Sequence, residues 1–253
     1  MSETDDKLLA KRFSELARKS DNGGYFTFTD FLGLSEQSIF AEVERTLGKI
    51  RFTAFGGAPG CERIMIRFGD AEALGYEEPF PISTIKAEPK SQKFADKLTH
   101  RDFLGAIMNL GIERSCLGDI IIIDNVGYIF AKDDMAEYIC DSLTKIKHTD
   151  VRLSVTSELP EGELFRTEGM SIQLSSERLD AAVAKVFSLS REEAQTAFKR
   201  GLVFVCGRVC ESASYTPKVG ETISVRGHGR FIYDGQFGLS KKGKLNVAIR
   251  KYV

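Results

Sequence analysis

The sequence predicts an α+β protein that is divided into three domains. Segments of helical periodicity alternate with short strand patterns along 253 residues, a length that allows several compact domains. The middle third has the order β-α-β-β-α-β, and the last third places two short helices before a series of short strands. We expect an N-terminal α/β domain at residues 1–74, a middle domain at 75–160, a linker at 161–174 and a C-terminal domain at 175–253.

The N-terminal domain is expected to contain two helices and two strands. Apolar periodicity predicts one helix over residues 5–20 and a second helix that begins at a Ser35 N-cap. Strands are expected over residues 51–55 and 63–68, around the glycine-rich segment 56–60. Because a strand follows these glycines, and not the helix that a phosphate-binding loop requires, we favour a plain hairpin turn.

The middle domain shows the most regular order of elements. This order is that of the split βαβ fold, which ferredoxin-like and RRM-like domains share. The elements are expected at residues 82–87 (strand), 99–110 (helix), 119–123 and 126–131 (two strands around an Asp124-Asn125 turn), 133–146 (helix) and 151–156 (strand).

Charge is distributed unevenly along the chain. Residues 172–253 contain 14 Lys and Arg against 7 Asp and Glu, a net charge of +7, whereas residues 1–171 carry −8. One basic domain on an acidic protein suggests a polyanionic partner. The longest aliphatic run, residues 120–123, is too short for a membrane span, and five scattered cysteines are typical of reduced thiols. We therefore expect a cytoplasmic protein with no membrane partner.

No motif predicts catalysis or metal binding. His100-Arg101-Asp102 resembles a kinase catalytic-loop tripeptide, but Ile107 occupies the position where a kinase needs Asn. Cys206, Cys210 and His228 lack the second ligand pair that a structural zinc site requires. We expect no catalytic residue, no metal and no cofactor.

The basic segment from Glu177 to Arg230 is the candidate RNA-binding module. Ser190 and Glu193 form a capping box that starts its second helix, and Arg191, Gln195 and Lys199 follow at a spacing of four on one face. For this helix alone, a solvated face is an equally good interpretation. The arginines at the element ends favour contact with phosphates. The candidate contacts are Arg178, Lys185, Arg191, Gln195, Lys199, Arg200, Arg208, Arg226, His228 and Arg230.

A second candidate surface lies in the middle domain. Its expected strands lack the aromatic signature of an RNA-stacking platform, because Tyr128 and Phe130 stand alone. Any RNA contact is therefore expected from its loops or helices. Nearby acidic residues dilute the charge of this surface. The secondary candidates are Lys86, Lys90, Lys93, Lys97, Arg101 and Arg114.

The basic module resembles the RNA-binding motif named after small-subunit ribosomal protein S-four. Cys206 stands where that family usually has Asn, which puts a polar contact from this position in doubt but not the turn. The residues that carry the resemblance are Arg178-Leu179-Asp180, Ser190-Arg191, Gln195, Lys199-Arg200-Gly201, Val203, Val205, Gly207 and the segment 220–227.

A further set of motifs is spread along the whole chain, at residues 30–32, Glu36-Gln37, 55–57, Glu62-Arg63, 99–105, 110–112, Arg114, 118–120 and 241–244. With these motifs the chain resembles the bacterial YlmH family. The resemblance implies a non-enzymatic RNA-binding protein with an N-terminal domain, an RRM-like middle domain and the S-four-type motif. It further implies binding to rRNA of the large ribosomal subunit and to tRNA, in the rescue of stalled subunits, with a weaker link to cell division. We expect the protein to be a monomer.

Two other functions are compatible with an S-four-type motif. An rRNA-modifying enzyme, either a pseudouridine synthase or a methyltransferase, could use the same motif but would need a catalytic domain within residues 1–170. Neither the nucleoside loop of a methyltransferase nor the Asp motif of a synthase is found there. A protein-interaction scaffold with incidental basic charge is the third possibility.

Overall fold

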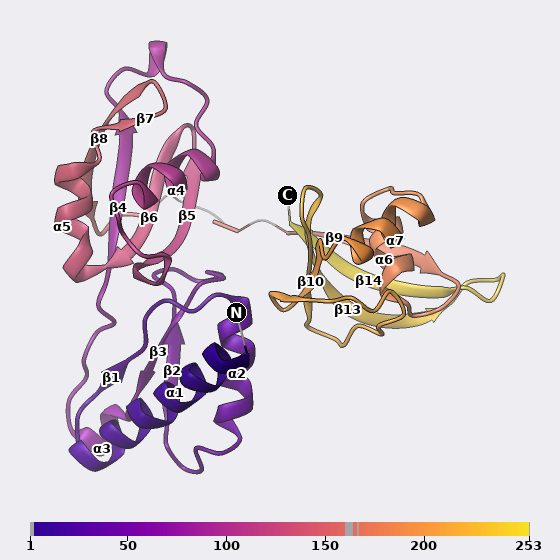
Figure 1. Cartoon of the computed structure of the whole chain (residues 1–253), viewed down its shortest axis with the longest axis horizontal. Coiled ribbons are helices and arrows are strands. Elements are labelled where there is room, and N and C mark those ends of the chain that lie inside the picture. Colours follow the sequence, from indigo (N-terminus) through magenta and orange to yellow (C-terminus); the bar gives the residue numbers. More distant parts are fainter. Residues whose placement is uncertain (1–2, 160–163, 166, 253) are drawn as a thin grey trace. The chain divides into compact units, whose positions relative to one another are not determined.

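A computed structural model describes residues 3–159, 164, 165 and 167–252 of the chain (Figure 1). The chain divides into two compact units, residues 1–164 and 165–253. The first unit contains the N-terminal and middle parts of the sequence. Among the described residues, no helix has both the length and the apolar character needed to cross a bilayer.

The N-terminal part consists of helices against a three-stranded sheet in the order β1-β3-β2 (Figure 1). Helix α1 buries Phe13, Leu16 and Ala17 because their spacing of three and four puts them on one face. The ring of Phe13 meets that of Phe40 in α2 edge to face. The elements are α1 (Glu3–Gly23), β1 (Thr27–Phe28), α2 (Leu34–Glu44), β2 (Phe52–Phe55), β3 (Met65–Phe68) and α3 (Ala71–Leu74).

The expected Ser35 N-cap is wrong by two residues. Helix α2 begins at Leu34, and its N-cap is Gly33. The Glu36 carboxylate accepts a hydrogen bond from the Gly33 N–H at 2.6 Å, which is the reciprocal half of a capping box. Glycine offers no side-chain acceptor at the cap, so the Glu36 contact is the side-chain part of this cap. The expected strands at 51–55 and 63–68 correspond to β2 and β3, which pair antiparallel as expected of a hairpin.

The middle part is a five-stranded antiparallel sheet in the order β5-β6-β4-β8-β7, with α4 and α5 packed on one face (Figure 1). Phe103 and Ile107 of α4 and Ile139 of α5 meet Ile85 and Ile129 of the central strands in one core. The elements are β4 (Ile82–Pro89), the 3-10 turn η1 (Gln92–Phe94), α4 (His100–Met108), the 3-10 turn η2 (Arg114–Cys116), β5 (Leu117–Ile123), β6 (Val126–Lys132), α5 (Asp133–Ser142), β7 (Lys145–Ile146) and β8 (Thr149–Thr156).

The second helix of the middle part is shorter than the expected range of 133–146. Helix α5 ends at Ser142, and Lys145–Ile146 is a short strand that pairs with β8. Leu143 and Ile146 are both buried, as a continuing helix face would require. In the structure these side chains enter the same core from an extended chain. Apolar spacing alone therefore could not distinguish a continuing helix from a short strand.

The second unit is a six-stranded antiparallel sheet in the order β11-β10-β12-β13-β14-β9. Helices α6 and α7 lie on one face of it (Figure 1), where Leu179, Val183 and Phe198 pack against Ile223 and Phe231. The elements are β9 (Thr167–Leu174), α6 (Leu179–Val186), α7 (Arg191–Lys199), β10 (Val203–Val205), β11 (Arg208–Val209), β12 (Thr222–Val225), β13 (Gly229–Leu239) and β14 (Leu245–Tyr252).

The linker expected at 161–174 is wrong in its second half. Residues Thr167–Leu174 form β9 and pair with β14 along its whole length. Only Ile172 and Leu174 are buried in this edge strand, so the sequence has little alternation to reveal it. Residues 160–163 and 166 of the expected linker region lie outside the described residues.

Candidate nucleic-acid interface

A basic groove lies on the helical side of the second unit. It has a volume of about 710 Å³, and Arg178, Lys185, Arg191 and Lys244 are among the residues that line it. Arg178 is the N-cap of α6, Lys185 lies in the last turn of that helix, and Arg191 is the first residue of α7. Lys244 comes from the turn before β14. The sequence predicted the first three as RNA contacts and did not select Lys244, because only the fold brings that turn beside the helices.

Arg178 is held in place by a buried carboxylate. Its guanidinium donates two hydrogen bonds to Asp180, Nε to Oδ1 at 3.0 Å and Nη2 to Oδ2 at 2.9 Å. Asp180 is 4% exposed and also accepts from the Ala181 N–H. The hydrogen bond from Arg178 lowers the pKa of Asp180, which is therefore ionised at neutral pH. This planar bidentate pairing fixes the orientation of Arg178 in the groove wall.

Helix α7 presents a row of polar side chains beside the groove. Its start is the expected capping box, because Ser190 Oγ accepts from the Glu193 N–H and the Glu193 carboxylate accepts from the Ser190 N–H. Arg191 and Lys199 are exposed, and Gln195 between them is half-buried. Arg200 is the exposed C-cap of the helix. Arg191, Gln195 and Lys199 thus follow one another at a spacing of four along α7.

The remaining candidates of the module lie on the strands. The Arg226 guanidinium lies over the Phe204 ring at 5.4 Å, and that of Arg230 lies over the Tyr252 ring at 3.9 Å. The register aligns Phe204, Ser224 and Arg230, which share the face that is turned away from the helices. These arginines are therefore separated from the groove by the sheet. Arg208 is exposed in β11, and the ring of exposed His228 lies 6.0 Å from that of Phe187.

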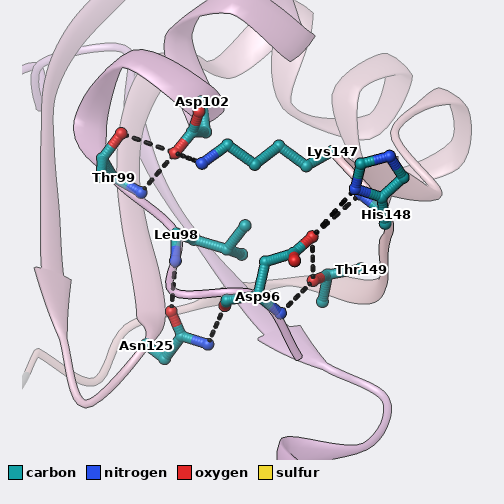
Figure 2. Close-up of polar contacts among 8 residues, drawn as sticks. All are labelled: Asp96, Leu98, Thr99, Asp102, Asn125, Lys147, His148 and Thr149. Atoms are coloured by element: carbon teal, nitrogen blue, oxygen red, sulfur yellow. Dashed lines mark hydrogen bonds and ion pairs between the residues drawn. The ribbon is translucent and has the colours of Figure 1, made fainter. Parts of the chain in front are cut away.

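The middle part carries a second basic region around the loop between β4 and α4. Figure 2 shows how side chains fix this loop. The Asn125 side chain accepts from the Leu98 N–H and donates to the Asp96 carbonyl, both at 2.8 Å. The Asp96 carboxylate accepts from the His148 N–H at 3.1 Å, and the Asp96 N–H donates to Thr149 Oγ1 at 2.8 Å. The loop is thus tied to both neighbouring hairpins.

This braced loop displays a very exposed aromatic residue. Phe94 is 81% exposed, and the Lys93 ammonium lies 5.6 Å from its ring centre. Lys90 and Lys97, like Lys93, are exposed. Three of the secondary candidates therefore lie on the same loop as an accessible ring.

A groove of about 500 Å³ lies on the helical side of the same part, and Arg101, Lys145 and Lys147 contribute to its lining. Lys147 also forms an ion pair with Asp102 at 2.8 Å (Figure 2). Sequence reasoning missed Lys145 and Lys147 because it placed this stretch at and beyond the end of a helix. The short strand β7 and its turn bring them next to α4.

Two of the secondary candidates, Lys86 and Arg114, form polar contacts within the protein. Lys86 forms an ion pair with Glu88 at 2.8 Å within β4. Arg114 Nη1 donates to the carbonyls of Leu117 and Gly118 at 2.8 and 2.9 Å. Burial lowers the pKa of Arg114 to about 10, with a further contribution from Arg63 nearby. Both side chains thus already have polar partners within the protein.

Arg63 and Asp119 join the N-terminal and middle parts of the first unit. Arg63 donates to the carbonyl of Leu117 at 2.8 Å and to those of Phe31 and Arg114 at 3.0 Å. Asp119 Oδ2 accepts from the N–H groups of Glu62 and Arg63 at 2.5 and 3.2 Å. Burial lowers the pKa of Arg63 and raises that of Asp119. We interpret this cluster as a structural clamp.

The glycine-rich segment after β2 covers the sheet of the middle part. A Cβ at Gly57 would lie 2.3 Å from a carbon of the Phe130 ring, and Phe130 is fully buried. This close contact requires glycine. It also removes Phe130 from any stacking role, which agrees with the expectation that this domain would bind through loops or helices.

Within its described residues, the structure contains no cluster of three or more His, Cys, Asp or Glu side chains able to hold a metal ion. All five cysteines are free thiols. Burial raises the pKa of Cys61 to about 12, so this thiol is protonated at neutral pH.

Comparison with known proteins shows a similarity to YlmH proteins. Residues 77–159 match the family described as the putative RNA-binding domain in YlmH. Ribosome-associated protein quality control protein P2 from Bacillus subtilis (strain 168) is 29% identical over 230 residues, which cover 88% of this chain and 86% of that protein. This chain is thus similar to the YlmH family.

A solved structure of a protein named YlmH is also similar to part of this chain. Cell division protein ylmH from Streptococcus pneumoniae is 24% identical, covers 62% of this chain and 93% of its own, and gives a TM-score of 0.48. The matched residues 77–159 contain the braced loop with Phe94, whereas the basic groove of the second unit lies outside them.

Proposed function

We propose that this protein binds RNA and acts in ribosome-associated quality control, where it associates with rRNA of the large subunit and with tRNA on stalled subunits. The observation that carries this proposal is the groove lined by Arg178, Lys185, Arg191 and Lys244 in the basic part of an otherwise acidic chain. A cluster of cations of this kind is typical of a surface that binds the phosphate backbone of a nucleic acid. The names of the matched family and of the Bacillus subtilis relative support the same function.

We further propose that the second unit is an S-four-type RNA-binding domain and that residues 75–160 are an RRM-like domain. The helix pair α6 and α7 followed by the β10–β11 hairpin supports the first assignment. The order β-α-β-β-α-β and the strand order β5-β6-β4-β8 support the second. Residues 1–74 would then be a third domain, clamped to the middle one through Arg63.

In this proposal the groove side chains contact phosphates and Gln195 contacts a base edge or a ribose hydroxyl. Arg178 is preorganised by Asp180, so it loses little conformational freedom when it pairs with a phosphate. Arg191, Lys185 and Lys199 are exposed and can adapt to the backbone of the RNA. The protein acts as a cytoplasmic monomer that binds without catalysing a reaction.

The first test reverses charge on the exposed face of α7. The double variant Arg191→Glu, Lys199→Glu is expected to lose co-sedimentation with large ribosomal subunits and to keep its melting temperature, because both side chains are exposed. The matched control is Arg18→Glu with Lys19→Glu, which reverses two exposed charges on α1. Wild-type co-sedimentation by the α7 variant would contradict the assignment of this face.

The second test measures how RNA affinity depends on salt. Each phosphate contact that is removed lowers the slope of log K against log salt by roughly 0.7 to 0.9. Lys185→Ala and Arg191→Ala are each expected to reduce the slope, while Arg18→Ala leaves it unchanged. Binding that does not respond to salt would instead favour a protein-interaction scaffold.

The absence of catalysis is tested on the RNA itself. We expect large-subunit rRNA to carry the same pseudouridines and methyl groups with and without the protein, measured by mass spectrometry of nucleosides. A modification that depends on the protein would establish an rRNA-modifying enzyme. A link to cell division, if it follows from RNA binding, is expected to be lost in cells that carry only the α7 double variant.

A further inference from the structure

The hairpin between β13 and β14 exposes two large apolar side chains. Phe237 is 61% exposed and Leu239 is 63% exposed. Large apolar side chains at this exposure commonly mark a contact surface when they occur together. Figure 1 shows the turn of this hairpin as a yellow loop that projects beyond the strands of the second unit.

A β-bulge places Phe237 at this position. In the β13–β14 ladder Gln236 pairs with Val247 and Gly238 pairs with Asn246, so Phe237 has no direct partner on β14. A bulge leaves its extra residue outside the ladder and changes the direction of its side chain. The bulge therefore leaves the Phe237 side chain exposed, without a paired residue on β14.

The surroundings of Phe237 are strongly basic. The stretch from Gln236 to Asn246 contains Lys241, Lys242 and Lys244 and no acidic residue. Asp234, before this stretch, is already paired with Arg250 at 2.9 Å. An exposed aromatic ring among lysines fits a nucleic acid strand, which offers a base for the ring and phosphates for the cations.

The turn has a defined shape. The Ser240 N–H donates to the Lys244 carbonyl at 2.7 Å, and the Gly243 N–H donates to the Ser240 carbonyl at 2.9 Å. Ser240 Oγ accepts from the Lys244 N–H at 2.9 Å. These bonds hold Lys244 where it contributes to the basic groove beside Arg178 and Arg191. The hairpin surface is thus continuous with the groove.

We propose that Phe237 stacks on an unpaired base of the bound RNA, while Lys241, Lys242 and Lys244 contact the adjoining phosphates. This inference rests on the proposed RNA binding and adds a specific contact for single-stranded or bulged RNA. Leu239, two residues further along β13, is a second exposed apolar side chain of this hairpin. The role of this hairpin differs from that of the groove, which contacts phosphates and carries no exposed aromatic residue at its lining.

The test separates stacking from charge. Phe237→Ala is expected to weaken binding to deproteinised large-subunit rRNA by roughly 5- to 100-fold and to leave the salt slope unchanged, because no phosphate contact is lost. Lys241→Ala is expected to lower the slope. Phe237→Tyr should retain most of the affinity. Leu8→Ala is the control, since Leu8 is 62% exposed on α1 in the first unit.

A fluorescent probe reports the stacking directly. The chain contains no Trp, so Phe237→Trp introduces a single indole. We expect the emission of this variant to be quenched by the rRNA, whereas Leu8→Trp is expected to keep its emission. Vesicles of anionic phospholipid are the comparison ligand, and they should leave the emission of the Phe237→Trp variant unchanged.

Wild-type affinity of Phe237→Ala, or indole emission that responds to the vesicles and not to rRNA, would overturn the proposal. Failure of the proposed function would look different, because the wild-type protein itself would then not bind the rRNA.

Discussion

Cys206 has a backbone conformation that its side chain disfavours. It lies at φ 47° and Gly207 at φ 74°, so both residues of this two-residue turn between β10 and β11 are left-handed. Such turns strongly prefer Asn-Gly, because Asn tolerates positive φ better than other side chains. The sequence supplies glycine at the second position only.

We therefore expect Cys206→Asn to stabilise the second unit by about 0.5–1 kcal/mol. The measurement is the free energy of unfolding in urea under reducing conditions. Cys206→Ala is the control, because it removes the thiol without improving the preference for positive φ. A gain of the same size in the alanine variant would show that the thiol, and not the backbone, limits stability.

Helix α4 shows how a helix terminus and a distant turn act together. Thr99 precedes the helix, and its N–H and hydroxyl donate to the Asp102 carboxylate at 2.8 and 2.6 Å. The Lys147 ammonium approaches the same carboxylate from the turn after β7 (Figure 2). These contacts lower the pKa of Asp102 to about 2, with Lys147 as the largest cause.

The depressed pKa predicts a pH dependence of stability. The ionised form is favoured by folding, so the contribution of Asp102 is present above an unfolded pKa of about 4. It is lost as the pH falls toward about 2, the pKa in the folded protein. Lys147→Met is expected to raise the pKa of Asp102, as measured by carboxyl NMR titration. Lys145→Met serves as control, since Lys145 is exposed and forms no described contact with Asp102. An unchanged pKa in Lys147→Met would contradict this assignment.

At the scale of the whole molecule, the first unit depends on the Arg63 clamp. Three carbonyls, of Phe31, Arg114 and Leu117, accept hydrogen bonds from this one guanidinium, and they come from both parts of the unit. Loss of a donor to partly buried acceptors costs about 1–3 kcal/mol for each unsatisfied group. The second unit has a core of its own, with no residue in common with the cores of the first.

Arg63→Met is therefore expected to destabilise the first unit by on the order of 3 kcal/mol and to leave the second unit unchanged. Hydrogen exchange of the full chain would measure both outcomes, because amide protection should fall within residues 1–164 and persist within 167–252. Arg18→Met on the exposed surface of α1 is the matched control. Equal loss of protection in both units would contradict the separation of the two cores.

Much of the fold could be predicted because local signals agreed with the core. The Ser190–Glu193 box and Gly201 bound α7 as expected, and the Asp124-Asn125 turn joins β5 and β6. Predictions failed where a single pattern was compatible with two structures. The spacing of Leu143 and Ile146 fits the buried face of a helix, but both residues are equally well buried from an extended chain. Strand β9 has too little apolar alternation to be recognised as an edge strand.

The candidate site divides in the same way. The sequence alone determined that the basic charge lies in the last third and that Arg191, Gln195 and Lys199 share one helix face, since charge and helical spacing are local properties. Only the tertiary structure decided that Lys244 joins Arg178 in a groove and that Arg226 and Arg230 lie behind the sheet. It also decided that Arg114 is enclosed among carbonyls and that a bulge exposes Phe237. The physical reason is that strand pairing and register bring together residues far apart in the chain, and no local pattern specifies that pairing.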